Sequence, residues 1–330
     1  MKRFISLIMC ASLLTGCGGD GGSGNDAQVG YLTFHGIRGL SYETQSQSGI
    51  TGPLGEFRYY PGETLTFRLG SIILAKDVPA KERLSPLDLE PAHEAELRHG
   101  VMVDGLSTHK PVESELVLSD HYLINVYRLL LSLDADDNEK TGVFIRDEIL
   151  DEIAAYPIEE PINFHKAPSD FGNREIITAP ENLFVWALCF RIHSDRNCTN
   201  PYAGRNIKQE GTATSYMQAQ LDIISDAMSA NLYLSPYAFE IGSNDRSLQT
   251  VTIRSHNNKW SVAEIEAISH DDSVVAIHSI DPANQQVTFY NVSTEAEAET
   301  KLTINIRLEG DYRWLQKPLS VRIHPNPIKR

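Results

Sequence analysis

The chain has 330 residues, of which 41% are hydrophobic and 22% are charged, and its formal net charge is −15. This composition excludes a disordered chain, a collagen-like repeat and a polytopic membrane protein, and the length suffices for more than one domain. The charge balance argues against nucleic acid as a partner, because 29 Lys and Arg stand against 44 Asp and Glu and a phosphate backbone needs a basic surface.

The first residues predict export and lipidation. Lys2 and Arg3 precede an apolar run that is too short to span a bilayer. The run ends in Leu14-Thr15-Gly16-Cys17, which resembles the lipobox of bacterial lipoproteins. The resemblance implies that residues 1–16 are a signal peptide and that Cys17 begins the mature chain, with diacylglycerol on its thiol and an acyl chain such as palmitate on its amine. The alternatives are an ordinary secretory signal and a buried N-terminal helix.

A tether is predicted to follow the lipidated cysteine. Residues 18–26 consist of Gly, Ser, Asn and Asp, and a segment without apolar side chains behaves as a flexible coil, so residues 17–28 are assigned to it. Gly18 stands where an aspartate would resemble an inner-membrane retention signal, which favours the outer membrane. We therefore expect an outer-membrane lipoprotein that faces the periplasm or the cell surface, anchored by acyl chains without a transmembrane helix.

The four cysteines have separate predicted roles. Cys10 lies in the signal peptide and Cys17 carries the lipid. Cys189 and Cys198 remain as an even pair in an oxidising compartment, which predicts a structural disulfide that closes a short polar loop. The alternative is a metal site that includes His193, although the spacing matches no standard zinc motif.

A β-rich module is predicted over residues 29–78. Short apolar stretches separated by glycine and proline turns predict strands at 29–34, 39–42, 56–60, 64–69 and 72–74. Residues 39–70 resemble a module found near the N-terminus of surface lipoproteins and adhesin-like proteins of marine and soil proteobacteria. The Gly-x-Thr…Gly-x-Phe turn is also similar to transthyretin-type, carboxypeptidase-regulatory-like sandwiches, although Gly52 replaces their usual aspartate. The resemblance covers about residues 29–145 and implies a β-sandwich-like module without a known catalytic residue.

Helical periodicity marks the central region, residues 79–247. Apolar side chains three and four residues apart predict helices over 119–133, 144–156 and 214–231. Ser119 and Asp120 are candidate N-caps of the first helix. Paired methionines in the third helix are expected to fill the core.

From residue 248 to 330 the period of the pattern changes to two. Strands are predicted at 251–254, 263–267, 274–280, 287–292, 302–308 and 319–323, separated by polar turns. The pattern is similar to bacterial immunoglobulin-like (Ig-like) domains, with Trp260 available to fill the core. The predicted fold class is therefore mixed and β-rich: an N-terminal β-sandwich-like module, a central helical region and a C-terminal Ig-like antiparallel β-sandwich.

One acidic segment has the spacing of a cation-binding loop. Asp134, Asp136 and Asn138 alternate as the first, third and fifth ligands of an EF-hand-like loop do, and Lys140 would add its backbone carbonyl. The resemblance implies weak calcium binding, because the loop lacks the turn glycine and the bidentate glutamate of that family. The alternative is an ordinary polar turn between two helices. His93 and His99 do not share a helical face, so we expect a solvated surface rather than a metal site there.

The sequence contains none of the common catalytic motifs for a serine nucleophile, a zinc helix or a phosphate loop, and no catalytic residue is assigned. The leading hypothesis is a non-enzymatic envelope lipoprotein that acts in binding, adhesion or scaffolding. Its expected partners are the membrane, through the lipid anchor, and a protein or polysaccharide of the envelope. The alternative is an envelope hydrolase with a site assembled in the central region, and a third hypothesis is a chaperone for secreted substrates.

Overall fold

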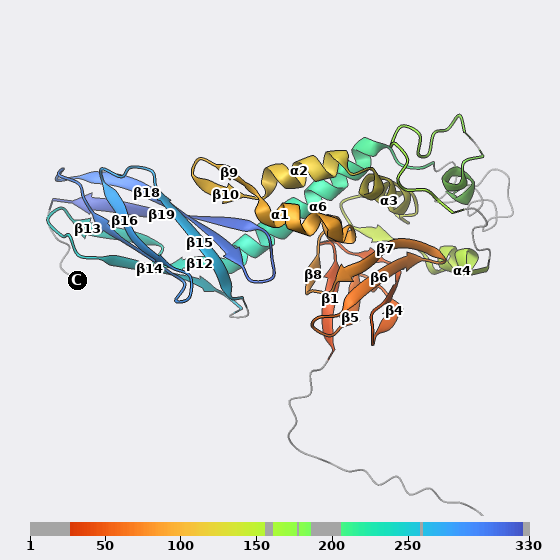
Figure 1. Ribbon diagram of the computed structural model, residues 1–330, viewed down its shortest axis with the longest axis horizontal. Helices are drawn as coiled ribbons and strands as arrows, with labels where there is room; N and C mark the ends of the chain where they lie inside the picture. The colour runs from red at the N-terminus through yellow and green to blue at the C-terminus, as the bar shows by residue number, and fades with distance from the viewer. Residues whose placement is uncertain (1–26, 156–160, 177, 186–205, 258–259, 326–330) are drawn as a thin grey trace, which may run out of the picture.

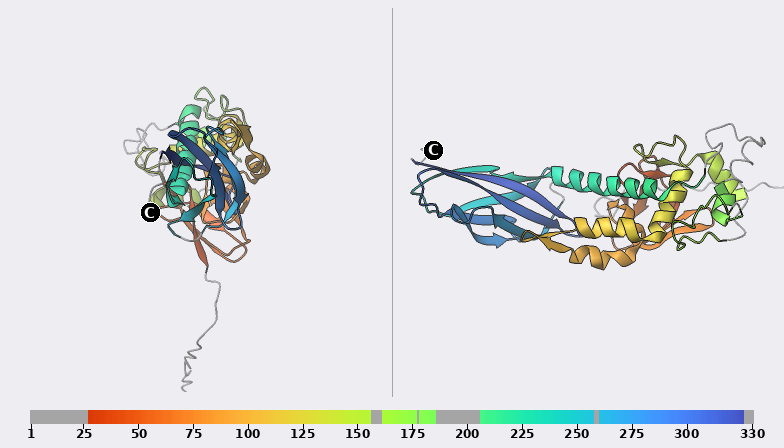
Figure 2. Two further views of the ribbon diagram at one scale, coloured as in Figure 1. Left: turned by 90° about the vertical axis from the view of Figure 1, so that its left-hand side faces the viewer. Right: turned by 90° about the horizontal axis from the view of Figure 1, so that it is seen from above.

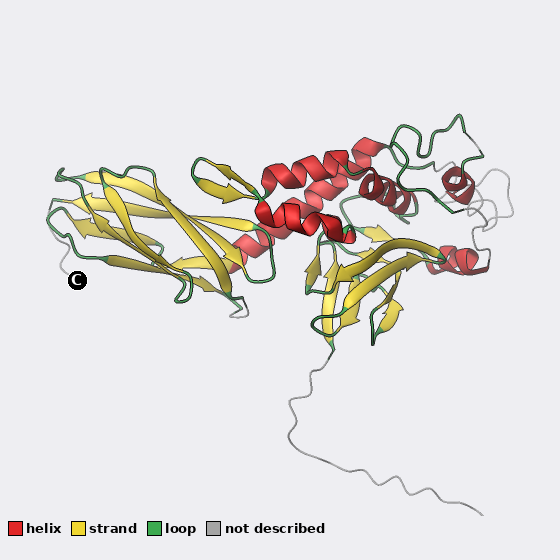
Figure 3. Cartoon of the chain, viewed as in Figure 1, coloured by secondary structure: helices red, strands yellow, loops and turns green. Residues whose placement is uncertain are grey.

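The computed structural model describes residues 27–155, 161–176, 178–185, 206–257 and 260–325. These residues form an elongated molecule with a mixed body at one end and a β-sandwich at the other (Figure 1). Figure 3 shows strands in both parts of the molecule and helices packed on the sheets of the body, which confirms the predicted β-rich, multidomain fold class. The last described residue of the C-terminus lies at the end of the sandwich that is remote from the body (Figure 1).

Alternating side chains build the N-terminal sheets of the body. In β6 (Thr64–Leu69) every second residue is buried, because successive side chains of a strand point to opposite faces. The buried rings of Phe57 and Phe67 pack edge to face at 5.8 Å in the core between the sheets. One sheet has the order β4 (Ser48–Ile50), β3 (Ser41–Glu43), β6 and β7 (Ile72–Pro79); a second has the order β5 (Glu56–Tyr59), β1 (Gln28–Leu32) and β8 (Arg83–Leu84).

Helices cover these sheets and complete the body. Two short 3-10 helices come first, η1 (Pro86–Leu89) and η2 (Pro91–His93). The α-helices of the body are α1 (Glu94–His99), α2 (Lys110–Ser119), α3 (His121–Ser132), α4 (Asp147–Ala155) and α6 (Glu210–Asn231). Between α1 and α2 lies a hairpin of β9 (Val101–Val103) and β10 (Leu106–Thr108). α3 is the central helix, since all its residues from Leu123 to Ser132 are buried. Asp120 is its N-cap, as predicted, and accepts a hydrogen bond of 2.8 Å from the backbone N–H of Leu123.

The N-terminal sheets and the helices share one hydrophobic core. It combines Leu32 and Phe67 of the sheets with Tyr127 of α3 and Leu221 of α6. Gln220, also on α6 and 1% exposed, accepts hydrogen bonds from the backbone N–H groups of residues 34 and 35. The two segments that the sequence separates at residue 78 therefore pack as a single body.

The sandwich has the strand order of an Ig-like domain. One sheet contains β12 (Leu232–Ser235), β14 (Gln249–Ser255), β17 (Gln286–Asn291) and β16 (Val275–Asp281), and the other contains β13 (Ala238–Gly242), β19 (Trp314–His324), β18 (Ala298–Leu308) and β15 (Val262–Ser269). In the first sheet, β12, β14, β17 and β16 correspond to strands A, B, E and D of an Ig domain. In the second sheet, β19, β18 and β15 correspond to strands G, F and C. β13 extends the second sheet by pairing in parallel with the last strand. Trp260 packs at the margin of the sandwich core.

Two predicted boundaries require correction. The sandwich begins at Leu232 rather than at residue 248, because β12 and β13 pair with β14 and β19. Both strands are short, and the first follows α6 directly, so they offered no long alternating pattern. The helix predicted over 144–156 begins at Asp147, because Phe144 pairs with Arg38 in a two-stranded sheet formed by β11 (Val143–Phe144) and β2 (Ile37–Arg38).

Candidate functional site

Several predicted site residues lie outside the described residues. They include the lipidation candidate Cys17, the proposed disulfide partners Cys189 and Cys198, and His193. In the parts of the chain that are described, no helix is long and apolar enough to cross a bilayer. Lipidation and the disulfide therefore stay predictions.

The predicted cation-binding loop folds back on its own backbone. Asp134 accepts hydrogen bonds from the N–H groups of Phe144 and Asn138, at 2.9 and 3.1 Å. Asp136 accepts from the same Asn138 N–H at 3.0 Å, and its carboxyl shares a hydrogen bond with that of Asp134. The side-chain oxygen of Asn138 accepts from the N–H of Lys140. The structure therefore brings the two aspartates together, while the asparagine oxygen serves the turn.

This arrangement fits a divalent cation in part. Burial, reinforced by the facing Asp136, raises the pKa of Asp134 to about 6. No group of three or more His, Cys, Asp or Glu side chains suited to a metal is found within the described ranges. Calcium at this loop stays a prediction beside the alternative of a hydrogen-bonded polar turn.

The two histidines considered as metal ligands separate in the structure. His93 pairs with Asp120, the N-cap of α3, and His99 ends α1. The hydrogen bond to Asp120 raises the pKa of His93 against the effect of its burial. His93 therefore joins η2 to the start of α3, a structural role.

The body and the sandwich meet at a turn that the sequence did not indicate. The turn between β18 and β19 inserts Tyr312 into the hydrophobic core of the body. The Tyr312 hydroxyl donates to Glu113 of α2 at 2.8 Å and accepts from Arg313 at 2.7 Å. The N–H of Trp314 donates to His109 Nδ1 at 3.0 Å. Hydrogen bonds between residues about two hundred positions apart in the chain thus fix the sandwich to the body.

The charged groups of this junction are almost fully buried. Glu113 is 0% exposed, and Arg313 and His109 are 1% exposed. Burial, with the nearby Arg313 and Lys110, lowers the pKa of His109 to about 3, so the imidazole is neutral and can accept the Trp314 N–H. Burial raises the pKa of Glu113, although Arg313 lies 3.5 Å from its carboxylate and opposes this rise.

A hairpin of the body adds a second attachment to the sandwich. Ser107 of β10 donates to the Glu266 carboxylate through its N–H at 2.7 Å and through its hydroxyl at 2.6 Å. Asn305 of β18 donates to the Ser107 carbonyl at 2.8 Å. Because Glu266 and Asn305 are paired across β15 and β18, the hairpin holds both strands and restricts rotation about the junction.

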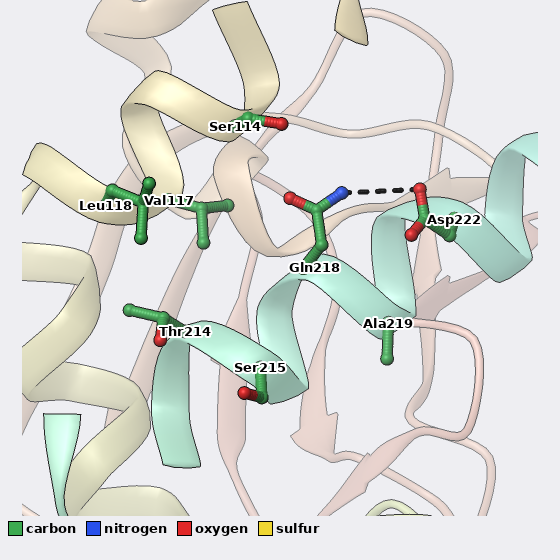
Figure 4. A pocket seen from close by; sticks show the side chains of 8 residues that line it. All are labelled: Ser114, Val117, Leu118, Thr214, Ser215, Gln218, Ala219 and Asp222. Atoms are coloured by element: carbon green, nitrogen blue, oxygen red, sulfur yellow. Dashed lines mark hydrogen bonds between the residues drawn. The ribbon is translucent and has the colours of Figure 1, made fainter. Parts of the chain in front are cut away.

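A groove lies between α2 and α6, which run side by side along the body (Figure 2). Its volume is about 590 Å³ and it is open to solvent. Figure 4 shows Gln218 extending from α6 towards α2 and bonded to Asp222 at 3.3 Å. Hydroxyl, amide, carboxylate and apolar groups share the lining, which consists of Ser114, Val117, Leu118, Thr214, Ser215, Gln218, Ala219 and Asp222. Such a surface can recognise a ligand through hydrogen bonds and a small apolar contact.

Comparisons with known proteins identify no family. No protein-family model and no curated protein matches the chain. Domains 4 and 5 of the S-layer protein SbsC align over 28% of this chain and 44% of that chain, at 12% identity and a TM-score of 0.22. An endo-beta-1,4-mannanase from Thermotoga petrophila aligns over 37% of this chain and 27% of that chain, at 6% identity and a TM-score of 0.19. The alignments span less than half of either structure, and similarity at this level assigns no function.

The structure of the junction predicts that breaking its buried ion pair lowers the free energy of unfolding much more than breaking an exposed ion pair. We expect Arg313→Met to lower the free energy of unfolding by about 3–5 kcal/mol, because it removes the buried guanidinium that lies beside the carboxylates of Glu113 and Asp311. The matched control, Arg322→Met, breaks an exposed pair with Glu299 and should cost no more than about 1 kcal/mol. Urea unfolding measures both. The double variant Arg313→Met/Glu113→Leu should recover only the part of the loss that comes from Glu113, because Asp311 also loses the guanidinium. Equal costs for the two single variants would contradict this account.

The acidic loop predicts a calcium response that depends on pH. Protons and calcium compete for Asp134, so the ion should raise the melting temperature at neutral pH and have less effect below pH 6, near the raised pKa of this carboxyl. Calorimetry with and without millimolar calcium measures the shift. Asp134→Ala/Asp136→Ala should abolish the shift, whereas the control Asp271→Ala/Asp281→Ala in the sandwich should retain it. A wild-type curve that calcium does not move would identify the loop as a polar turn.

Proposed function

We propose that this protein is a non-enzymatic, lipid-anchored lipoprotein of the bacterial outer membrane that acts in binding, adhesion or scaffolding at the envelope. The lipobox-like motif at Cys17 and the following tether support the anchor. The structural observation that carries the proposal is the attachment of an Ig-like sandwich to the body through hydrogen bonds of the Tyr312 turn and of the Ser107 hairpin. Such a construction holds a second domain at a constant orientation, which suits a protein that positions partners.

Two surfaces of the body suit a protein or polysaccharide partner. The groove between α2 and α6 combines hydrogen-bonding groups with the exposed side chain of Leu118. On the hairpin, Val101, Met102 and Val103 are consecutive and exposed, Met102 to 70%. Adjacent exposed apolar residues on a short edge strand favour contact with another molecule. The envelope hydrolase remains the alternative function.

Anchoring is tested by substitution of the lipidation candidate. In a Gram-negative host we expect the wild-type protein to fractionate with the outer membrane and Cys17→Ser to be released into the periplasm or left uncleaved, because the acyl chains supply the membrane affinity. Cys10→Ser, within the predicted signal peptide, is the matched control and should remain anchored. A Cys17→Ser protein that is processed normally and still bound to the membrane would refute the anchor.

Binding is tested by capture of partners from envelopes with the mature protein. Ala219→Trp fills the groove, whereas Ala230→Trp places the same ring on an exposed position of α6 outside the groove lining. We expect a specific partner to be captured by the wild type and by Ala230→Trp, and at least about tenfold less by Ala219→Trp, because the ring excludes the partner sterically. Equal capture by both variants would exclude the groove. Turnover of envelope polymers by the purified wild type would support the hydrolase instead.

A further inference from the structure

A second, more enclosed pocket of about 250 Å³ lies where the sandwich meets the body. Three parts of the chain form its wall: the end of β7 with the residues after it, the segment from η1 to α1, and the turn between β18 and β19. The turn contributes Gly310 and Tyr312. This position at a domain junction is one where small-molecule sites occur preferentially.

The floor of the pocket is apolar. Leu87, Leu97 and Tyr312 line it and are each no more than 3% exposed. The Tyr312 hydroxyl is held by Glu113 and Arg313 inside the junction. Pro79 and Pro91 add further apolar surface. The floor therefore suits a small hydrocarbon side chain.

The rim carries both signs of charge. Lys81 lies 2.7 Å from Asp88, and Arg98 donates to Glu94 through Nε and one terminal nitrogen at 3.0 and 2.8 Å. An ammonium has three donors and a guanidinium has five, so both cations retain donors for an additional carboxylate. Glu90 and Glu94 provide carboxylates that can accept from a ligand ammonium. The charges are thus arranged for a molecule that carries one group of each sign.

We propose that this pocket binds a small zwitterion with an apolar side chain, namely a free α-amino acid or a dipeptide. The ligand carboxylate would lie against Lys81 and Arg98, its ammonium against Glu90 and Glu94, and its side chain over the apolar floor. The volume is below the range of about 300–1,000 Å³ that is typical for drug-sized ligands, which favours a molecule of amino-acid size. The proposal does not depend on the lipid anchor or on the groove.

Bound ligand would also connect the two parts of the molecule. Because the wall includes the sandwich turn as well as η1 and α1, a ligand contacts both sides of the junction. A ligand that binds only the assembled junction stabilises it by mass action. Ligand binding should therefore raise the melting temperature as well as produce heat in a titration.

The test is calorimetric titration and thermal unfolding of the full mature chain with four probes: leucine, leucyl-leucine, N-acetyl-leucine and leucinamide. The last two lack the ammonium and the carboxylate, respectively. We expect leucine or leucyl-leucine to bind at millimolar concentration or below, and both blocked forms to bind at least about tenfold more weakly, because each loses a charge-assisted contact. Comparison of leucine with leucyl-leucine decides between a free amino acid and a peptide.

Variants locate the site. Arg98→Gln removes a rim cation and should weaken binding of the preferred probe at least about tenfold. Arg322→Gln alters a similarly exposed Arg–Glu pair in the sandwich and should bind as the wild type does. Circular dichroism checks that both variants are folded. The proposal is overturned if no probe binds at millimolar concentration, if the blocked forms bind equally well, or if the two variants give the same affinity.

Discussion

The hydrogen bond between Tyr312 and Glu113, with Arg313 beside it, is the constraint on which the arrangement of the two parts depends. A carboxylate that is fully withdrawn from water is costly unless it is paired and hydrogen-bonded. Glu113 comes from the body, where Lys110 lies 3.6 Å from its carboxylate, and the sandwich adds the Tyr312 hydroxyl and the Arg313 guanidinium. Separation of the parts would expose the Tyr312 ring and leave these groups without each other. The junction is therefore specific in geometry, because other orientations would not satisfy the same atoms.

The neutral state of His109 belongs to the same arrangement. Its Nδ1 atom accepts the N–H of Trp314, the first residue of β19, and so meets a backbone donor at the start of the strand. Burial and the neighbouring cations favour the uncharged ring. The Ser107 hairpin attaches to the outer side of the sandwich independently, and α6 continues into β12 without a linker. Three connections of different kinds thus hold one orientation.

The elements that could be predicted from the sequence are those that depend on a pattern of neighbouring residues. The alternation of Leu302, Ile304 and Ile306 identified β18, and all three are fully buried. The N-cap of α3 was predicted because capping depends on neighbouring residues. β12 and β13 were missed, since a four- or five-residue strand beside a long helix carries little periodicity and its pairing depends on distant strands. That the N-terminal module packs with the helices was missed for the same reason. The contact depends on residues far apart in the chain, since Gln220 accepts hydrogen bonds from residues 34 and 35.

The same distinction applies to the candidate sites. The acidic loop lies within a few consecutive residues, so spacing alone indicated it, although only the structure shows that its oxygens largely serve the loop backbone. The junction and both pockets are assembled from segments far apart in the chain. Glu113 and Arg313 each look like ordinary surface residues in sequence, and no local pattern indicates that they meet.

The parallel pairing of β13 with β19 has a mechanical consequence. Five residues of β13 pair with β19 between Ser320 and His324, and both strands run from the body towards the remote end of the sandwich (Figure 1). A force that pulls this end away from the body acts along the strands, whereas the hydrogen bonds run across them. All the bonds of the pair then carry the load together instead of opening one after another. The sandwich is accordingly built to resist tension along the long axis of the molecule.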